Sequence, residues 1–212
     1  NYKLEGVDAS GLELRMLAHY MNDERYTNEV VNGDIHTANQ IAAGLESRDK
    51  AKTFIYAFIY GAGTSKIGSI IGGTQRDGER VKEKFLRATP SLRSLREKVE
   101  RVAQRRWVKG LDGRKIIIRH PHAALNTLLQ GAGAIVMKKA LTLLDEYVNN
   151  KQIKAFPVVN VHDEFQYEVE ESRADEFGRL AVQSIVDAGK LLKVRCPLNG
   201  EYKIGNNWSE TH

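Results

Sequence analysis

The sequence predicts an α+β fold in which a helical segment interrupts a small sheet. Strand-like runs lie near both ends of the 212-residue chain, whereas residues 34–106 show mostly helical periodicity. Hydrophobic residues make up 42% of the chain, enough for a core, and 28% charged residues with only 4 prolines exclude a collagen-like or extensively disordered chain. No apolar run approaches the ~20 residues of a membrane span. We therefore expect a soluble globular protein with a small, mostly antiparallel sheet, packed helices and one helical insertion.

Apolar spacing and capping residues predict the elements of the first half. A short strand ends on Asp8, and apolar residues at intervals of three and four predict a helix directly after it. Asp34, Ser47 and Thr64 have side chains that cap helix N-termini, and glycines at 61 and 63 end the second of these helices. The predicted elements are a strand at 4–8 and helices at 9–21, 35–43, 48–60, 64–72, 77–87 and 90–105.

The second half alternates strands with two long helices. An Asp112-Gly113 pair between two strand-like runs predicts a hairpin, and two later runs meet at His162-Asp163-Glu164. The predicted elements are strands at 107–109 and 115–118, a helix at 122–148, a hairpin at 156–169, a helix at 173–188, and strands at 191–194 and 201–204. We expect the helical insertion to begin near residue 33 and to end near residue 106.

Positive charge is concentrated in one segment. The whole chain carries 32 basic and 27 acidic residues, whereas residues 76–119 contain 15 Lys or Arg and 6 Asp or Glu. Such a segment attracts phosphate backbones and releases their counterions. The alternative is a solvated helix surface with oppositely charged pairs four residues apart, such as Arg96 and Glu100.

The single cysteine, Cys196, and an N-terminus without a signal peptide predict a reducing, cytosolic compartment.

Two acids stand at predicted strand ends, Asp8 and Asp163, 155 positions apart. Two carboxylates at ~4 Å and an effective dielectric of ~20 repel by ~4 kcal/mol, so a close pair must share a proton or bind cations. Carboxylate oxygens favour Mg²⁺, and two such ions can activate an attacking oxygen while stabilising a leaving one. Taken singly, each acid is equally compatible with a turn or capping role.

The helix predicted at 48–60 carries a row of two cations and two tyrosines. Arg48, Lys52, Tyr56 and Tyr60 recur every four residues, so they lie along one face of the helix. This cation-and-tyrosine row suits a nucleoside triphosphate, with the phosphates near the helix N-terminus and the base near the tyrosines. The alternative is an amphipathic helix whose long basic side chains reach solvent.

Three motifs in order resemble those of the family A, Pol I-like DNA polymerases. Residues 8–15 (DASGLELR) resemble motif A, residues 48–61 (RDKAKTFIYAFIYG) resemble motif B on the fingers O helix, and residues 161–164 (VHDE) match motif C. Residues 33–37, 110–114 and 122–130 are similar to the replicative enzymes of podovirus phages. The resemblance extends from Asp8 to Trp208 and implies palm at 1–32, fingers at 33–106 and palm at 107–212.

The resemblance also implies roles for individual positions. Asp8 and Asp163 would hold two Mg²⁺ ions with the carbonyl of Ala9, and Lys52 would protonate the leaving pyrophosphate. Glu164 would be auxiliary, because adjacent strand residues point to opposite faces. The implied nucleotide contacts are Glu13, His36, Arg48, Lys52, Tyr56 and Tyr60, and the implied primer-template contacts are Asn126, Gln130 and His162.

The implied function is template-directed transfer of a nucleotide from a dNTP to a primer 3′-hydroxyl. Because the resemblance starts just before motif A, we expect only the palm and fingers portion, with activity impaired without a thumb, an exonuclease region or a processivity factor. We expect a phage protein in the cytoplasm of a bacterial host, with no membrane partner. Two alternatives remain open: a non-catalytic DNA-binding module or subunit of a split polymerase, and a two-metal nuclease.

Overall fold

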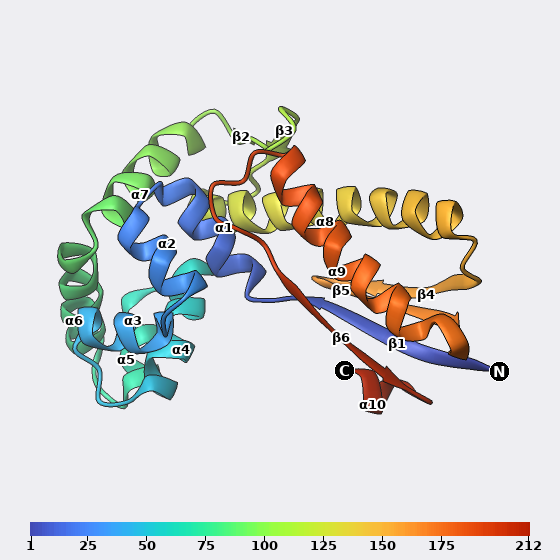
Figure 1. Cartoon of the computed structure of the whole chain (residues 1–212). Coiled ribbons are helices and arrows are strands. Elements are labelled where there is room, and N and C mark those ends of the chain that lie inside the picture. The colour runs from blue at the N-terminus through green and yellow to red at the C-terminus, as the bar shows by residue number, and fades with distance from the viewer. The chain divides into compact units, whose positions relative to one another are not determined.

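Strand β1 (Tyr2–Ala9) is a central strand of a four-stranded antiparallel sheet. The strand order is β4-β5-β1-β6, with β4 at Ala155–Val161, β5 at Glu164–Glu170 and β6 at Gly200–Gly205 (Figure 1). The register places Asp8 opposite Glu164 on β5 and opposite Glu201 on β6. Segments from the two ends of the chain therefore meet at the end of β1.

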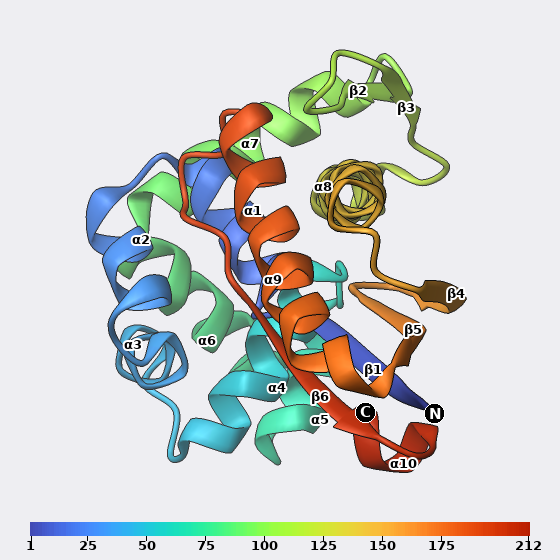
Figure 2. The same ribbon diagram turned by 45° about the vertical axis from the view of Figure 1, so that its right-hand side comes forward.

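Helices pack on both faces of this sheet. Helix α9 (Ala174–Leu191), which follows the short η2 (Glu171–Arg173), contacts β1, β5 and β6, and α10 (Trp208–Thr211) contacts β1 and β6 (Figure 2). Glu5 approaches Gly178 of α9, whereas its neighbour Gly6 approaches Thr211 of α10. Because successive residues of a strand face opposite sides, α9 and α10 cover opposite faces.

The computed structural model describes all 212 residues, which form two compact units. The first, which we call the sheet unit, is Asn1–Met16 with Gly131–His212, and the second, the helical unit, is Leu17–Gln130. The chain passes between them within α1 (Leu12–Met21) and within α8 (Ala124–Lys151). The predicted palm and fingers boundaries near residues 32 and 106 stay a prediction.

Short capped helices build the helical unit. Asp34 and Ser47 accept backbone N–H groups at the starts of α3 and α4, and Thr74 forms a reciprocal capping box with Asp77. Phe54, Phe58 and Phe85 form a buried aromatic cluster with ring centroids 5.2 to 6.0 Å apart. The helices are α2 (Glu24–Val31), α3 (Ile35–Ala43), α4 (Arg48–Ile59), α5 (Thr64–Ile71), α6 (Gln75–Ala88) and α7 (Pro90–Ala103), followed by β2 (Trp107–Lys109), β3 (Lys115–Ile117) and η1 (Pro121–Ala123).

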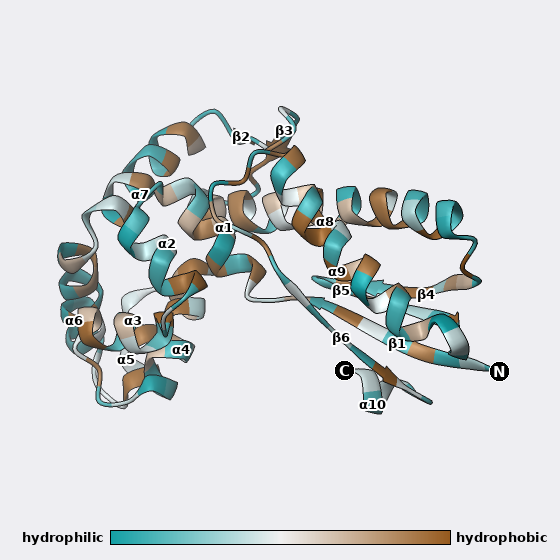
Figure 3. Ribbon diagram, viewed as in Figure 1, coloured by the Kyte–Doolittle hydropathy of each residue, from teal (hydrophilic) through white to brown (hydrophobic).

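The α+β prediction is confirmed, and most elements lie within a few residues of their predicted places. Figure 3 shows apolar and polar stretches alternating along α8 and α9, as expected for helices with one buried face.

The strand predicted at 191–194 is wrong, because α9 continues to Leu191 and a turn follows it. The cap predicted at Thr64 is also wrong, since α5 begins at Thr64 and its N-cap is Gly63. Helices α2 and α10 were not predicted. No helix has the length and apolar character needed to cross a bilayer.

Candidate active site

The end of β1 brings together the acids predicted from the two ends of the chain. Asp8 is the next-to-last residue of β1, Asp163 lies in the β4–β5 turn, and Glu164 begins β5. The backbone N–H of Ala9 donates to the carbonyl of Asp163 at 3.0 Å, which ties the end of β1 to that turn. We call Asp8, Asp163 and Glu164 the acid cluster.

The acid cluster contains strong like-charge repulsion. Burial, followed by the charges of Asp163, Glu164 and Glu201, raises the pKa of Asp8 to about 6, while His212 acts in the opposite direction. The side chain of Asp8 is nevertheless exposed. Cations brought from solvent would relieve this repulsion, so the electrostatics favour an oxygen-ligated divalent ion at this end of the sheet.

Glu164 is held in a hydrogen-bonded network that was not predicted. Gln166 donates its side-chain amide to Glu164 Oε1, and Thr211 donates its hydroxyl to Gln166 Oε1 at 2.8 Å. Nδ1 of His212 lies 2.6 Å from Glu164 Oε2. Glu164 is only 8% exposed, so its carboxylate is occupied by protein groups.

The argument from strand alternation for an auxiliary Glu164 does not apply here. Asp163 lies in a turn after His162, which has a φ of 56°, so Asp163 and Glu164 are not successive residues of one strand. Glu164 is also directly opposite Asp8, and opposed residues of antiparallel strands share a face. The prediction of an auxiliary role for Glu164 therefore rests on the occupied carboxylate alone.

The donors at this end of the sheet suit Mg²⁺. Asp8 and Asp163 supply carboxylate oxygens and Ala9 supplies a backbone carbonyl, and hard oxygen ligands are those that Mg²⁺ prefers. Mg²⁺ needs only one or two protein carboxylates, because substrate phosphates and water complete its shell. The chain contains no group of three or more His, Cys, Asp or Glu residues arranged to hold a metal ion.

Helix α4 presents the cation-and-tyrosine row to solvent. Arg48, Lys52 and Tyr60 are exposed and Tyr56 is half-buried, whereas the opposite face packs inward. The buried face consists of Ala51, Phe54, Ile55, Phe58 and Ile59. The predicted amphipathic orientation is therefore present in the helix.

His36 joins this row from the N-terminus of α3. Its ring centroid is 6.2 Å from that of Tyr56, and its Nδ1 atom is buried without a hydrogen-bond partner. Burial lowers the pKa of His36, and the nearby charges of Arg48 and Lys52 lower it further. The helical unit thus brings His36 close to Arg48, Lys52 and Tyr56.

Asp34 provides the acid that partly neutralises the row. Its carboxylate accepts hydrogen bonds from the backbone N–H groups of His36 and Thr37 at the start of α3. It also accepts a hydrogen bond from Nε of Arg48 at 2.7 Å. These contacts hold the pKa of Asp34 well below its usual range, with the Arg48 hydrogen bond the largest cause. Arg48 keeps its two terminal nitrogens for a ligand.

The other predicted contact residues occupy three places. Glu13 is half-buried in the first turn of α1, and His162 is exposed at the tip of the β4–β5 turn. Asn126 and Gln130 are one turn apart on α8, where Asn126 is half-buried with an unpartnered Oδ1 and Gln130 is exposed.

Ion pairs use part of the basic segment at 76–119. Within it Arg80 pairs with Asp77, Arg93 with Glu83, Arg96 with Glu100 and Arg114 with Asp112. The predicted surface pairing is therefore present. The segment still contains nine more basic than acidic residues, so a polyanion-binding surface remains compatible with it.

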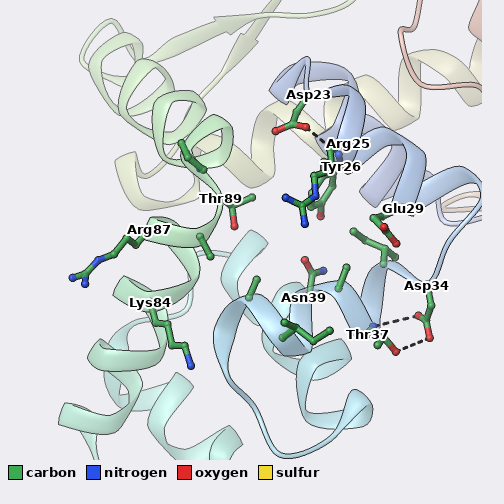
Figure 4. A pocket seen from close by; sticks show the side chains of 16 residues that line it. Asp23, Arg25, Tyr26, Glu29, Asp34, Thr37, Asn39, Lys84, Arg87 and Thr89 are labelled. Carbon is green, nitrogen blue, oxygen red and sulfur yellow. Dashed lines mark hydrogen bonds between the residues drawn. The ribbon is translucent and has the colours of Figure 1, made fainter.

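A cavity of about 1050 Å³ lies in the helical unit but does not include the row. Figure 4 shows its lining from α2, α3, α6 and the start of α7, with Arg25, Asn39 and Thr89 directed toward its centre. Asp34 belongs to this lining, whereas Arg48, Lys52 and Tyr56 do not. The row therefore lies outside this cavity.

The residues missed from the sequence are those that support Glu164. Gln166 follows Glu164 at a spacing of two, which places both on one face of a strand, so the sequence contained a signal for it. Thr211 and His212 lie more than 40 positions away in the chain, and no local pattern connects them to β5.

Comparison with known proteins agrees with this geometry. Residues 1–210 match the family model described as DNA polymerase family A. The chain is 43% identical to the DNA-directed DNA polymerases of Enterobacteria phage T3 and Escherichia phage T7, over 98% of this chain and 33% of each relative. It is 25% identical to DNA polymerase I of Pseudomonas aeruginosa, over 100% of this chain and 25% of that protein. The chain therefore spans about a third of the length of its phage relatives.

A solved structure has the same fold. It is the POL domain of Pol1 from M. smegmatis in complex with DNA primer-template and dNTP, with a TM-score of 0.87 and 21% identity. The match covers 98% of this chain and 40% of the other. This similarity extends the fold assignment to almost every residue of both units.

Proposed function

Because the chain belongs to DNA polymerase family A, we propose that it performs template-directed transfer of a nucleotide from a dNTP to a primer 3′-hydroxyl. The observation that carries the proposal is the acid cluster, where chain folding brings Asp8 and Asp163 to one sheet end across 155 positions. The 43% identity to two phage DNA polymerases supports it. A location in the cytoplasm of a bacterial host belongs to the same proposal.

In the proposed reaction the chain supplies position and charge. Asp8, Asp163 and the carbonyl of Ala9 would hold two Mg²⁺ ions, which when bound activate the attacking hydroxyl and stabilise the leaving pyrophosphate. Arg48 and His36 bind the triphosphate, and Lys52 protonates the departing pyrophosphate. The positive charges at the start of α4 lower the free energy of the phosphates as negative charge shifts toward the leaving group.

The remaining predicted residues orient the substrates in this proposal. Tyr56 lies beside the sugar and base, Glu13 crowds a ribose 2′-hydroxyl, and Tyr60 stacks on the template side. Asn126, Gln130 and His162 contact the primer terminus and the minor groove, where every correct pair presents acceptors. Glu164 is auxiliary.

Primer extension tests the proposal. The chain spans about a third of its phage relatives, so the assay uses excess protein, low salt and a short primer-template with Mg²⁺ and dNTPs. We expect template-dependent addition of one or a few nucleotides, and loss of at least about a hundredfold in rate in Asp8→Asn and Asp163→Asn. Glu168→Gln, an exposed acid on β5, is the control and retains the rate.

Two other outcomes would contradict the proposal. Degradation of single-stranded DNA without nucleotide would identify a two-metal nuclease, which does not need the cation-and-tyrosine row. Salt-sensitive duplex binding that survives both asparagine substitutions, with no synthesis under any condition, would identify a DNA-binding module or the subunit of a split polymerase.

A further inference from the structure

Arg15 lies in the first part of α1, six residues after Ala9, the last residue of β1. Its Nε donates to the carbonyl of Ser10 at 2.7 Å, and its Nη1 donates to the carbonyl of Pro197. The structure contains no ion pair that involves Arg15. This arginine therefore joins the nearby Ser10 carbonyl to the distant Pro197 carbonyl, and it also contacts the Cys196 thiol, instead of pairing with a carboxylate.

The bridged segments surround the proposed metal ligands. The N–H of Ser10 donates to the carbonyl of Asn199 at 3.0 Å, and the N–H of Ala9 donates to the carbonyl of Asp163 at 3.0 Å. Gly200 allows this close approach, because a Cβ there would lie 2.9 Å from the carbonyl oxygen of Asp8. The backbone from Asp8 to Ser10 is thus fixed from both sides.

We infer that Arg15 is a positioning residue, which holds the turn after β1 against the 195–199 segment so that Asp8 and the Ala9 carbonyl face a divalent cation in a fixed geometry. The inference rests on the proposed function, because that function makes Asp8 and Ala9 metal ligands. Ser10 directly follows Ala9, so the Ser10 N–H and the Ala9 carbonyl share one peptide plane. Movement of Ser10 therefore turns the plane that contains the Ala9 carbonyl.

An arginine suits this task better than a lysine. Its planar guanidinium directs several N–H donors in fixed directions, so one side chain can bond the Ser10 and Pro197 carbonyls at once. A lysine carries a single compact ammonium on a flexible stem. Groups that orient metal ligands in this way typically change metal affinity by about 10- to 100-fold when they are removed.

Mn²⁺ titration followed by electron paramagnetic resonance tests the inference without relying on activity. We expect Arg15→Gln to weaken Mn²⁺ binding about tenfold, and Arg15→Lys to weaken it less. Arg173→Gln is the matched control, because Arg173 also bonds a backbone carbonyl, that of Lys151, within the sheet unit. This control should bind Mn²⁺ like the unmodified chain.

Hydrogen exchange separates positioning from general stabilisation. We expect the Ser10 amide to exchange faster in Arg15→Gln while the amides of α9 exchange at unchanged rates. Unchanged Mn²⁺ affinity, or faster exchange throughout the sheet unit, would overturn the inference. Asp8→Asn separates a failure of the proposed metal site from a failure of the proposed role of Arg15. If Asp8→Asn binds Mn²⁺ as tightly as the unmodified chain, the metal site itself is wrong. If Asp8→Asn loses Mn²⁺ while Arg15→Gln does not, only the role of Arg15 is wrong.

Discussion

The acid cluster and the cation-and-tyrosine row both hold like charges close together, but they do so on different supports. The acid cluster lies where two strands and a turn are joined by backbone hydrogen bonds. The row lies on long side chains along an exposed helix face. Burial is the largest cause of the pKa shift in both regions, and like charge adds to it, so the pKa of Asp8 is raised in the first and the pKa of His36 is lowered in the second.

This difference suggests how the two regions divide the proposed chemistry. Metal ions require fixed oxygen positions, which the hydrogen-bonded sheet end provides. A triphosphate changes position and charge during the reaction, and flexible cations can follow it. In the proposed function, divalent cations complement the charge of the acid cluster, and phosphates complement the charge of the row.

The largest expected effect tests whether the row acts through position or only through charge. Lys52→Met should lower single-nucleotide incorporation about a thousandfold, because it removes both a phosphate contact and the proposed general acid. Lys50→Met is the matched control, since Lys50 is on the same helix but pairs with Glu46 and lies outside the row. Its rate should change by less than about threefold. Equal losses in both variants would show that α4 contributes only net charge.

The next effect is on the pH dependence of folding stability, and it concerns Glu5, a second acid on β1. Glu5 is fully buried, and neither carboxylate oxygen has a hydrogen-bond partner. Burial raises its pKa to about 8, and the charge of Asp175 contributes. Asp175 itself accepts the Tyr202 hydroxyl at 2.6 Å. Below pH 4.5, the ordinary pKa, Glu5 is neutral whether the chain is folded or unfolded.

Between pH 4.5 and about 8 the unfolded chain loses this proton first, so stability should fall as pH rises. We expect a loss of about 3 kcal/mol across this window, less than the full shift because local relaxation admits water to the charged form. Glu5→Gln should remove this part of the pH dependence, measured by urea unfolding at several pH values. Glu168→Gln is the exposed control. A slope that persists in Glu5→Gln would assign the proton to another group.

The third effect tests the end of the helix that carries the row. Gly61 has a φ of 81°, and a Cβ there would lie 2.6 Å from the carbonyl oxygen of His122. Gly61→Ala should therefore cost about 2 kcal/mol in the free energy of unfolding. Gly63→Ala is the control, because Gly63 has a φ of −70° and open space around it. Similar stability of the two variants would remove the proposed constraint.

Local sequence patterns predicted both regions for definite physical reasons. The four-residue spacing of the row and the capping side chains of Asp34 and Ser47 are local signals, and α3 and α4 begin where these signals place them. Asp8 and Asp163 were recognisable because each stands at a strand end. Their convergence depends on strand pairing across the chain, which a local pattern does not contain.

The missed features depend on contacts that are distant in sequence. His212 contacts Glu164 across 48 positions of the chain, and Arg15 contacts Pro197 across 182 positions. Helix α2 was missed although Asp23 caps it, because it has only eight residues and one buried side chain, Tyr26. A weak apolar pattern of this kind gives little evidence for a helix. The network around the acids could therefore be found only in the folded chain.

The smallest expected effect asks whether Asp34 limits the row. Its carboxylate occupies Nε of Arg48, and it also caps α3 through the N–H groups of His36 and Thr37. Asparagine is an equally good N-cap but carries no charge, so Asp34→Asn should keep the helix while freeing Arg48. We expect inorganic pyrophosphate to bind about threefold more tightly, measured by calorimetry without divalent ions.

Glu46→Gln is the control for this experiment, because Glu46 pairs with Lys50 and not with a residue of the row. It should leave pyrophosphate affinity nearly unchanged, which would show that a local acid rather than net charge is responsible. Weaker binding in Asp34→Asn would mean that the carboxylate orients Arg48 for the phosphates instead of competing with them. In that case the row would resemble the acid cluster, with its charges positioned before the ligand arrives.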